Sequence, residues 1–261
     1  PGTSGATYPF WSPDGRYVGF FSGGRLNTVE ATGGPALSLC NADDGRGGTW
    51  GPDGVILFAP GVNSPIHRIS VKGGAPVPVT TLDPSKNETS HRWPGFLPDG
   101  RHFIFMAGSV FTSIENPTNV INLGSLDSKG TKTLTRTHAG AVHASGNLLF
   151  LRQNTLMAQP LDLARLELTD VAVPVADHVA EAEIFSKGLF AASENGLLAY
   201  VQGAGSANRQ LVWFDRKGTR LGEVPEKGAY ACPRISPDGK RLLYYIDSGG
   251  STSGATTWRA A

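Results

Sequence analysis

The hydrophobic pattern of the chain is a series of short apolar runs divided by one recurring turn. Clear copies of the turn end in Pro-Asp-Gly at residues 12–15, 51–54, 97–100 and 236–239, with degenerate copies at 144–147 and 193–196. An apolar or small segment precedes the turn, and an aromatic and β-branched run follows it, as in residues 8–11 and 17–21. Proline sets φ at the second turn position and glycine accepts a positive φ at the fourth, so each copy predicts a hairpin between two strands.

These turns repeat with a period typical of a β-propeller blade. Their glycines are Gly15, Gly54, Gly100, Gly146, Gly196 and Gly239, at intervals of 39, 46, 46, 50 and 43 residues. A second turn about 20 residues later makes four strands per unit. We therefore expect an all-β fold, a single β-propeller domain of about six four-stranded antiparallel blades. The expected blades span residues 8–44, 45–90, 91–137, 138–186, 187–229 and 230–261.

The two ends of the chain predict an imperfectly closed ring. The last unit runs through the apolar residues 242–246 and a Gly/Ser loop to residues 256–259, so its fourth strand is missing. Residues 1–7 are rich in Gly, Ser and Thr, and we expect them to lie loosely along the last blade or to hang free. Because the chain opens on Pro1 and shows no signal peptide, it is interpreted as a fragment of a longer protein.

Composition narrows the class of protein. The 34 glycines and 18 prolines among 261 residues would interrupt most helices, which excludes a helical bundle or a coiled coil. The formal net charge is only +1, so no basic field favours nucleic acid as a partner. No apolar stretch reaches the ~18 residues of a membrane span, and no membrane insertion is expected.

The residues that could belong to catalytic or metal-binding motifs have structural explanations. The repeated aspartates Asp14, Asp53, Asp99 and Asp238 belong to hairpin turns on successive blades and do not predict a shared carboxylate site. The six histidines form no close-spaced ligand pair, and no Gly-x-Ser-x-Gly elbow is present. We expect no metal, no cofactor and no catalytic residue, although a Ser-His-Asp triad is defined in space and stays open.

Candidate binding residues lie in the loops that lead into the innermost strands. Such loops surround the axis of a propeller, where ligand sites tend to form. A mixed basic and aromatic rim there would suit an anionic or carbohydrate-like ligand, or an acidic peptide or protein. The alternative is that these are ordinary solvated loop residues. The candidates are Tyr8, Arg46, His91, Arg92, His138, Lys187 and Tyr230.

The repeated turn and its flanking strands resemble the TolB-like, WD40-like propeller repeats over nearly the full chain. More narrowly, residues 7–15, 90–103, 193–196 and 211–216 resemble the propeller that follows the kinase domain in bacterial eukaryotic-like serine/threonine kinases. Such a resemblance implies a non-catalytic, extracytoplasmic (periplasmic) module that binds or senses a ligand or protein.

Kinase chemistry itself is not expected in this chain. His91 and Arg92 are followed by Trp93, where a kinase has its catalytic aspartate, and no Asp-Phe-Gly occurs. The chain is therefore expected not to be an enzyme. The alternative function is the propeller domain of a prolyl-oligopeptidase-like hydrolase, or a propeller lyase.

Overall fold

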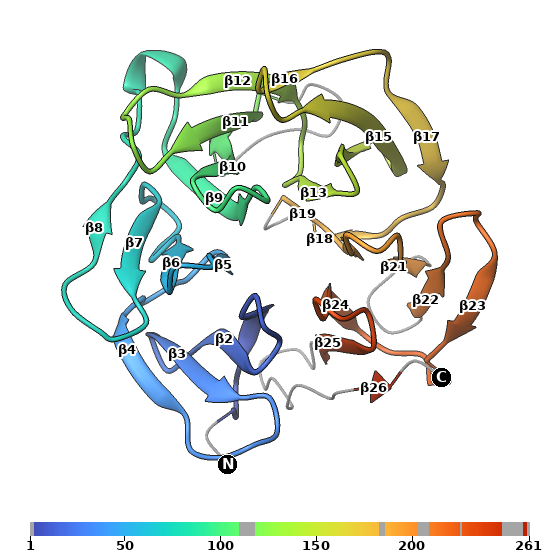
Figure 1. The fold of residues 1–261 in the computed structure, drawn as a ribbon, viewed down its shortest axis with the longest axis horizontal. Helices are drawn as coiled ribbons and strands as arrows, with labels where there is room; N and C mark the ends of the chain where they lie inside the picture. The colour runs from blue at the N-terminus through green and yellow to red at the C-terminus, as the bar shows by residue number, and fades with distance from the viewer. Residues whose placement is uncertain are drawn as a thin grey trace.

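The computed structural model shows a β-propeller, with antiparallel sheets that follow one another around a common axis (Figure 1). It describes residues 3–109, 118–182, 186–202, 209–224, 226–246 and 258–259. Within these ranges the only helical element is the short 3₁₀ turn η1 (Pro84–Lys86). No helix in these ranges could cross a membrane. The all-β expectation is confirmed.

Three four-stranded sheets form the first half of the ring, each paired in sequence order. The first contains β1 (Thr7–Trp11), β2 (Tyr17–Ser22), β3 (Arg25–Glu30) and β4 (Leu37–Asn41). The second contains β5 (Gly48–Trp50), β6 (Val55–Phe58), β7 (His67–Ser70) and β8 (Val77–Pro78). The third contains β9 (Ser90–Phe96), β10 (His102–Gly108), β11 (Val120–Ser125) and β12 (Lys132–Arg136).

The second half of the ring is less regular. A five-stranded sheet contains β13 (Val142–Ala144), β14 (Asn147–Arg152), β15 (Thr155–Asp162), β16 (Glu167–Leu168) and β17 (Val173–Ala176). The pair β18 (Glu181–Ala182) and β19 (Lys187–Gly188) leads into β20 (Phe190–Ala192), β21 (Leu198–Gln202), β22 (Gln210–Phe214) and β23 (Arg220–Glu223). The final sheet contains β24 (Tyr230–Ile235), β25 (Arg241–Ile246) and β26 (Trp258–Arg259).

The expected count of six four-stranded blades is wrong. Five blades have four or more strands, and the last sheet has three strands in the described part of the chain. Residues 247–257, which hold the expected Gly/Ser loop of the last unit, lie outside the described ranges. At the other end, the Ser22 hydroxyl donates to the Ser4 carbonyl at 2.7 Å. This contact joins the leading segment to the first blade. Thr3 and Ala6 also line a cavity with Leu243 and Tyr245 of the last blade, along which the segment was expected to lie.

The recurring turn forms the hairpins that the sequence predicts. In the first blade the Ser12 hydroxyl donates to the Asp14 carboxylate at 2.5 Å, and the Tyr17 amide donates to the Ser12 hydroxyl at 2.8 Å. Gly15 has a φ of 67°, a conformation that glycine adopts without strain. The hydrogen bond from Ser12 lowers the pKa of Asp14, so the carboxylate stabilises the turn in its charged form.

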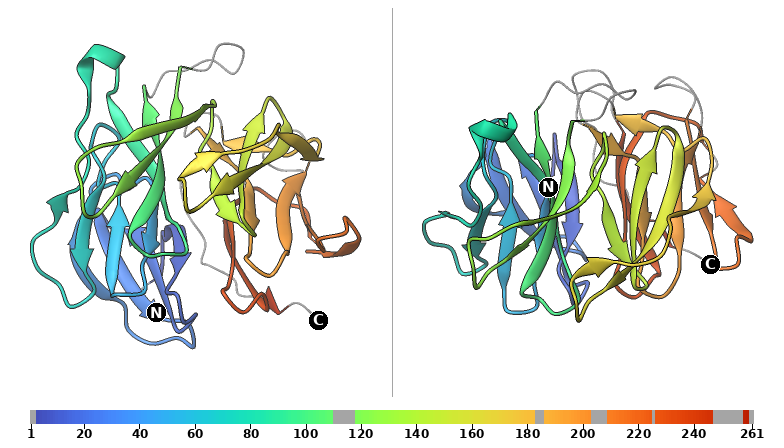
Figure 2. Two further views of the ribbon diagram at one scale, coloured as in Figure 1. Left: turned by 45° about the horizontal axis from the view of Figure 1, so that its top comes forward. Right: turned by 90° about the horizontal axis from the view of Figure 1, so that it is seen from above.

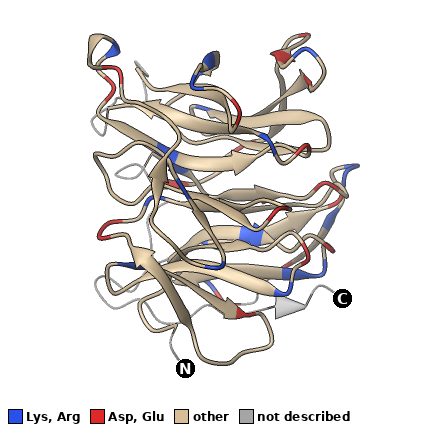
Figure 3. Cartoon of the chain, turned by 60° about the vertical axis from the view of Figure 1, so that its left-hand side comes forward, with Lys and Arg blue, Asp and Glu red and all other residues tan. Residues whose placement is uncertain are grey.

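Apolar side chains fill the spaces between neighbouring blades. Phe10, on β1, lies beside Gly19 and Gly48, where a Cβ would approach the Phe10 ring to 2.3 and 2.5 Å. The outermost strands are more exposed, as Leu37 and Val77 illustrate. In side view the strands run roughly along the axis (Figure 2), and charges of both signs are scattered over the outer loops and strand ends (Figure 3). The core therefore lies between blades, close to the axis.

Candidate functional site

The innermost strands carry residues in an unusual backbone conformation at one repeated position. Tyr8, Trp93 and Cys232 have φ values of 48°, 55° and 47°, and Gly47 has 87°. All four lie six positions before the aspartate of their turn. The register shifts near Tyr8, Trp93 and Cys232, so each forms a β-bulge. Left-handed conformations of non-glycine residues cost about 1–3 kcal/mol and gather at functional sites, which marks this level of the channel as a candidate.

Aromatic rings meet at this level. The rings of Tyr8 and Trp93 pack edge to face, with centroids 5.0 Å apart. Trp93 fits because Gly47 and Gly140, from the neighbouring blades, have no side chains, and a Cβ there would come within 2.6 and 2.8 Å of Trp93. The indole therefore spans the space between the second and fourth blades.

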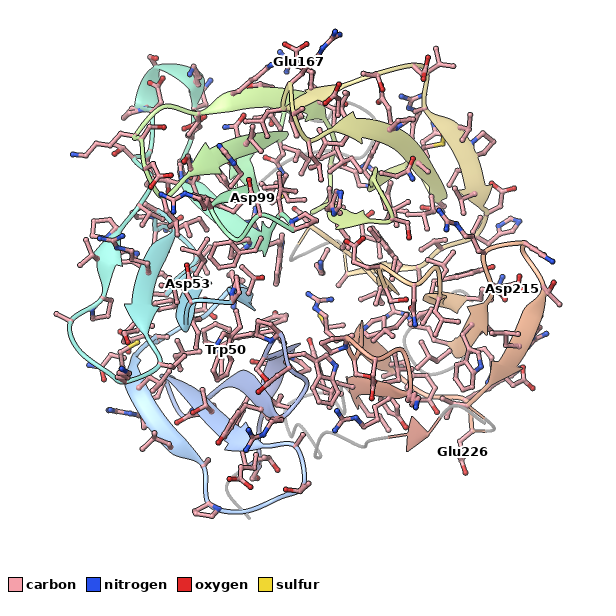
Figure 4. The ribbon with its side chains drawn as sticks, viewed as in Figure 1. Trp50, Asp53, Asp99, Glu167, Asp215 and Glu226 are labelled. Atoms are coloured by element: carbon pink, nitrogen blue, oxygen red, sulfur yellow. The ribbon has the colours of Figure 1, made fainter. Side chains whose placement is uncertain are left out.

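Three cationic side chains lie close to these rings. The Arg46 guanidinium is 5.9 Å from the Tyr8 ring centroid, and the Lys187 Nζ is 5.3 Å from the Trp93 ring centroid. Arg46 also pairs with the Asp44 carboxylate, with 2.8 Å between Nη2 and Oδ2. Burial and the nearby charge of Arg46 lower the pKa of Arg92 to about 10. The centre of the ring is therefore a cationic and aromatic environment, and Figure 4 shows nitrogen-tipped side chains there.

Lys187 has no carboxylate partner among the described residues. Its side chain is 1% exposed, and no acidic oxygen of the described residues lies within 4.0 Å of Nζ. Burial first, and then the charge of Arg234, lower the pKa of Lys187 to about 7. Near neutral pH the amine is therefore divided between its charged and uncharged forms.

A cavity of about 210 Å³ lies beside Trp93 and Lys187. Its lining includes Trp93, Lys187 and Arg234, together with His143 from the fourth blade, and it contains no aspartate or glutamate. Arg234 is half-buried, and its Nη1 donates to the Pro233 carbonyl at 2.9 Å. The lining therefore presents positive charge without a compensating acid.

His143 is held by an acid from the next blade. Its Nδ1 lies 3.1 Å from a Glu194 carboxylate oxygen, while the other oxygen accepts from the Ser145 amide at 2.8 Å. Because a carboxylate can only accept, Nδ1 carries the proton and Nε2 has the lone pair. Nε2 is buried and has no partner among the described groups. Burial lowers the pKa of His143, which keeps the ring neutral and able to accept a proton.

The structure divides the seven predicted site residues into two groups. Tyr8, Arg46, Arg92 and Lys187 lie together around the aromatic centre, as their ring contacts and electrostatic interactions show. The remaining three side chains have structural partners. His91 contacts Thr80 at 2.8 Å and Glu88 at 3.2 Å, His138 lies 2.7 Å from Glu181, and the Tyr230 hydroxyl donates to the Glu226 carbonyl at 2.5 Å.

Sequence analysis missed His143, Glu194 and Arg234. The first two carried a signal, because they replace the serine and the proline of the repeated turn in the fourth and fifth units, when Gly146 and Gly196 are aligned with Gly15. Such paired departures from a repeat indicate residues that serve something other than the turn. Arg234 carried no comparable signal.

No protein-family model and no curated protein matches the chain. Solved structures are similar to it over most of its length. Regucalcin from Agrobacterium tumefaciens, described as calcium-binding, aligns with a TM-score of 0.69 and 16% identity over 95% of this chain and 88% of its own. A gluconolactonase from Xanthomonas campestris aligns with a TM-score of 0.67 and 15% identity, over 95% of this chain and 84% of its own. TolB from Acinetobacter baumannii aligns with a TM-score of 0.61 and 15% identity, over 98% of this chain and 61% of its own.

These similarities confirm a β-propeller of TolB-like fold, and at this identity they show the fold alone. They raise the question of a metal site, because regucalcin binds calcium. In the described part of this chain, no three His, Cys, Asp or Glu side chains gather in a way that could hold a metal ion. The ionisable groups of the axial cavity are Lys187, Arg234 and His143, a set that repels a cation.

The comparisons overturn two expectations from the sequence. A non-catalytic, kinase-associated module was expected, but the similar structures give no link to kinase propellers and include an enzyme, gluconolactonase. The expectation that this chain is not an enzyme is contradicted as well, because the fold that it shares with these structures is one that enzymes use. The resemblance to kinase propellers rested on turn and strand residues, which the wider propeller fold shares.

Proposed function

We propose that this propeller serves a hydrolytic enzyme and binds a small anionic substrate in its axial cavity. One observation carries the proposal: the cavity is lined by Lys187 and Arg234 and by no aspartate or glutamate of the described residues. Cations in a partly desolvated channel attract an anion more strongly than exposed cations do. Small-molecule sites are concave, with a few convergent polar groups, and this cavity has that character.

His143 supplies a base for hydrolysis. A water molecule at Nε2 would give up a proton to the ring as its oxygen attacks the carbonyl carbon of an ester or lactone. The carbon–oxygen bond of the ester then breaks, and the leaving oxygen takes the proton from His143, which yields a carboxylic acid and an alcohol. Glu194 fixes the tautomer through Nδ1 and stabilises the protonated ring during the reaction. Arg234 and charged Lys187 attract the carboxylate of an anionic substrate into the cavity.

The test is hydrolysis of matched pairs of small aryl esters and lactones, with and without a carboxylate. We expect kcat/KM to be higher for the carboxylate-bearing member of each pair. Arg234→Gln should lower kcat/KM about tenfold for the anionic member and leave the neutral member nearly unchanged, because only the anion loses an attractive charge. His143→Gln should lower kcat for both by about 10²-fold or more.

The matched control is Arg101→Gln, since Arg101 is an exposed cation paired with Asp127. It should change neither kcat/KM nor the preference for anions. Equal turnover of anionic and neutral esters, or no turnover of any member of the panel, would overturn the proposal.

A further inference from the structure

We propose that Lys187 is a carbonyl-binding amine, whose Nζ forms an imine with small aldehydes and 2-oxo acids in the axial cavity. This activity goes beyond the hydrolysis proposed above and does not depend on it. It requires an amine that is enclosed, uncharged for part of the time, and accessible from a cavity large enough for the carbonyl compound.

Enclosure follows from the place of Lys187 on β19. The side chain is 1% exposed and lines the cavity, and its Nζ lies over the face of Trp93. An aromatic face contributes about 2 kcal/mol to a desolvated ammonium, which is less than the several kcal/mol that burial of the charge costs. The protein therefore does little to retain the proton on this amine.

The charge of Arg234 acts in the same direction as burial. From β24, Arg234 repels the ammonium, while Cys232 is a buried thiol whose pKa is raised by burial, so it stays uncharged near neutral pH. On β18, the strand paired with β19, the Glu181 carboxylate lies 2.7 Å from the His138 Nε2. No carboxylate of the described residues forms an ion pair with the Lys187 Nζ, and the pKa of Lys187 is lowered to about 7.

The cavity also sets the class of carbonyl compound. A volume of about 210 Å³ suits a molecule of a few carbons. Arg234 lines the same cavity and would attract a carboxylate group. The favoured ligands are therefore short aldehyde acids and 2-oxo acids.

The chemical step balances without a co-reactant. The lone pair of the Lys187 amine attacks the carbonyl carbon, and a carbon–nitrogen bond forms as the carbonyl oxygen is protonated. The amine proton and the new hydroxyl then leave as water, and a carbon–nitrogen double bond remains. Addition of water reverses the reaction.

Glyoxylate with sodium cyanoborohydride tests the proposal, because the added hydride reduces the imine to a stable secondary amine. Peptide mass spectrometry then gives the labelling rate of each lysine. At pH 7 an exposed lysine is about 10⁻³ uncharged. We expect Lys187 to be labelled at least tenfold faster than the exposed Lys72 and Lys240. Its rate should level off near pH 8, while that of an ordinary exposed lysine rises until about pH 10.

Two controls separate the site from general reactivity. In urea-denatured protein, Lys187 should react at the same rate as Lys72 and Lys240. Arg234→Gln should reduce Lys187 labelling by glyoxylate more than labelling by neutral formaldehyde. Native Lys187 labelling that is no faster than that of Lys72 at pH 7, or that rises in parallel with Lys72 up to pH 10, would overturn the proposal, whether or not the protein hydrolyses esters.

Discussion

At the scale of single residues, this propeller stabilises several cations with aromatic rings. Lys187 lies over Trp93 and Arg46 over Tyr8, and the Arg241 guanidinium lies 4.6 Å from the Trp11 ring centroid. Such contacts leave part of the cost of burying a charge uncompensated. The fold tolerates this cost most clearly at Lys187.

Lys187→Met should stabilise the protein at pH 7. The pKa of Lys187 falls from 10.5 to about 7 on folding, so between these values the unfolded chain binds more protons and native stability rises with pH. Removing the amine should therefore raise the free energy of unfolding at pH 7 by up to about 5 kcal/mol, less the lost contact with Trp93. By pH 10 most of this gain should disappear.

Urea denaturation at pH 7 and pH 10 measures this difference. Lys240→Met is the matched control because Lys240 is exposed, and its effect should be small at both pH values. An equal effect of Lys187→Met at the two pH values would contradict the lowered pKa.

At the scale of elements, close packing between blades depends on glycines in the strands. Gly48→Ala should destabilise the protein by about 1–3 kcal/mol, because the new Cβ would come within 2.5 Å of the Phe10 ring on the neighbouring blade. Gly61→Ala is the control, since a Cβ there meets nothing within 4 Å. The midpoint of urea denaturation should fall for Gly48→Ala. For Gly61→Ala the free energy of unfolding should stay within about 0.5 kcal/mol of the unsubstituted protein. Similar losses in both would contradict this account of the blade interface.

The hairpins could be predicted from the sequence, and the extra strand of the fourth blade could not. The Pro-Asp-Gly turns and their period predict the hairpins and the ring, because turn chemistry is local. The extra strand of the fourth blade was not predictable. There β15 has eight residues, and its two ends pair with different partners, Leu161–Asp162 with β16 and residues 156–158 with β17. The local sequence pattern does not predict which strands pair with the two ends of a long strand.

The candidate site was predictable in part for a similar reason. Arg46 and Lys187 follow from their place before the innermost strands, which the period reveals. The His143–Glu194 pair joins residues 51 positions apart on adjacent blades, and only the alignment of the two turns in space brings them together. The left-handed bulges at Tyr8 and Trp93 also escaped prediction, because they are imposed by the ring and not by local preference.

At the scale of the whole molecule, side chains join the first and last sheets. Arg241 donates to the Gly15 carbonyl at 2.7 Å, and the Trp11 indole donates to the Arg234 carbonyl at 3.2 Å. Removing one of these contacts therefore tests the prediction that the first and last sheets are held together weakly.

Arg241→Gln should weaken this junction. We expect a loss of about 1–3 kcal/mol in stability, from one charged hydrogen bond and one cation–π contact, and faster amide exchange in β24 and β25 than in β6. Arg101→Gln removes only an exposed ion pair with Asp127 and should cost less than about 1 kcal/mol. Unchanged exchange in β24 and β25 would mean that the ring is closed by other contacts.

The two hydrogen bonds of this junction span 226 and 223 residues of sequence. Bringing such distant segments together costs about 5 kcal/mol of loop-closure entropy, so the ring should close late in folding. During synthesis at about 5–20 residues per second, the first blade waits tens of seconds before the last sheet emerges from the ribosome. Its flank, with Trp11 and Val18, is exposed to other chains throughout that interval. We therefore expect chaperones that bind nascent chains to raise the yield of this protein.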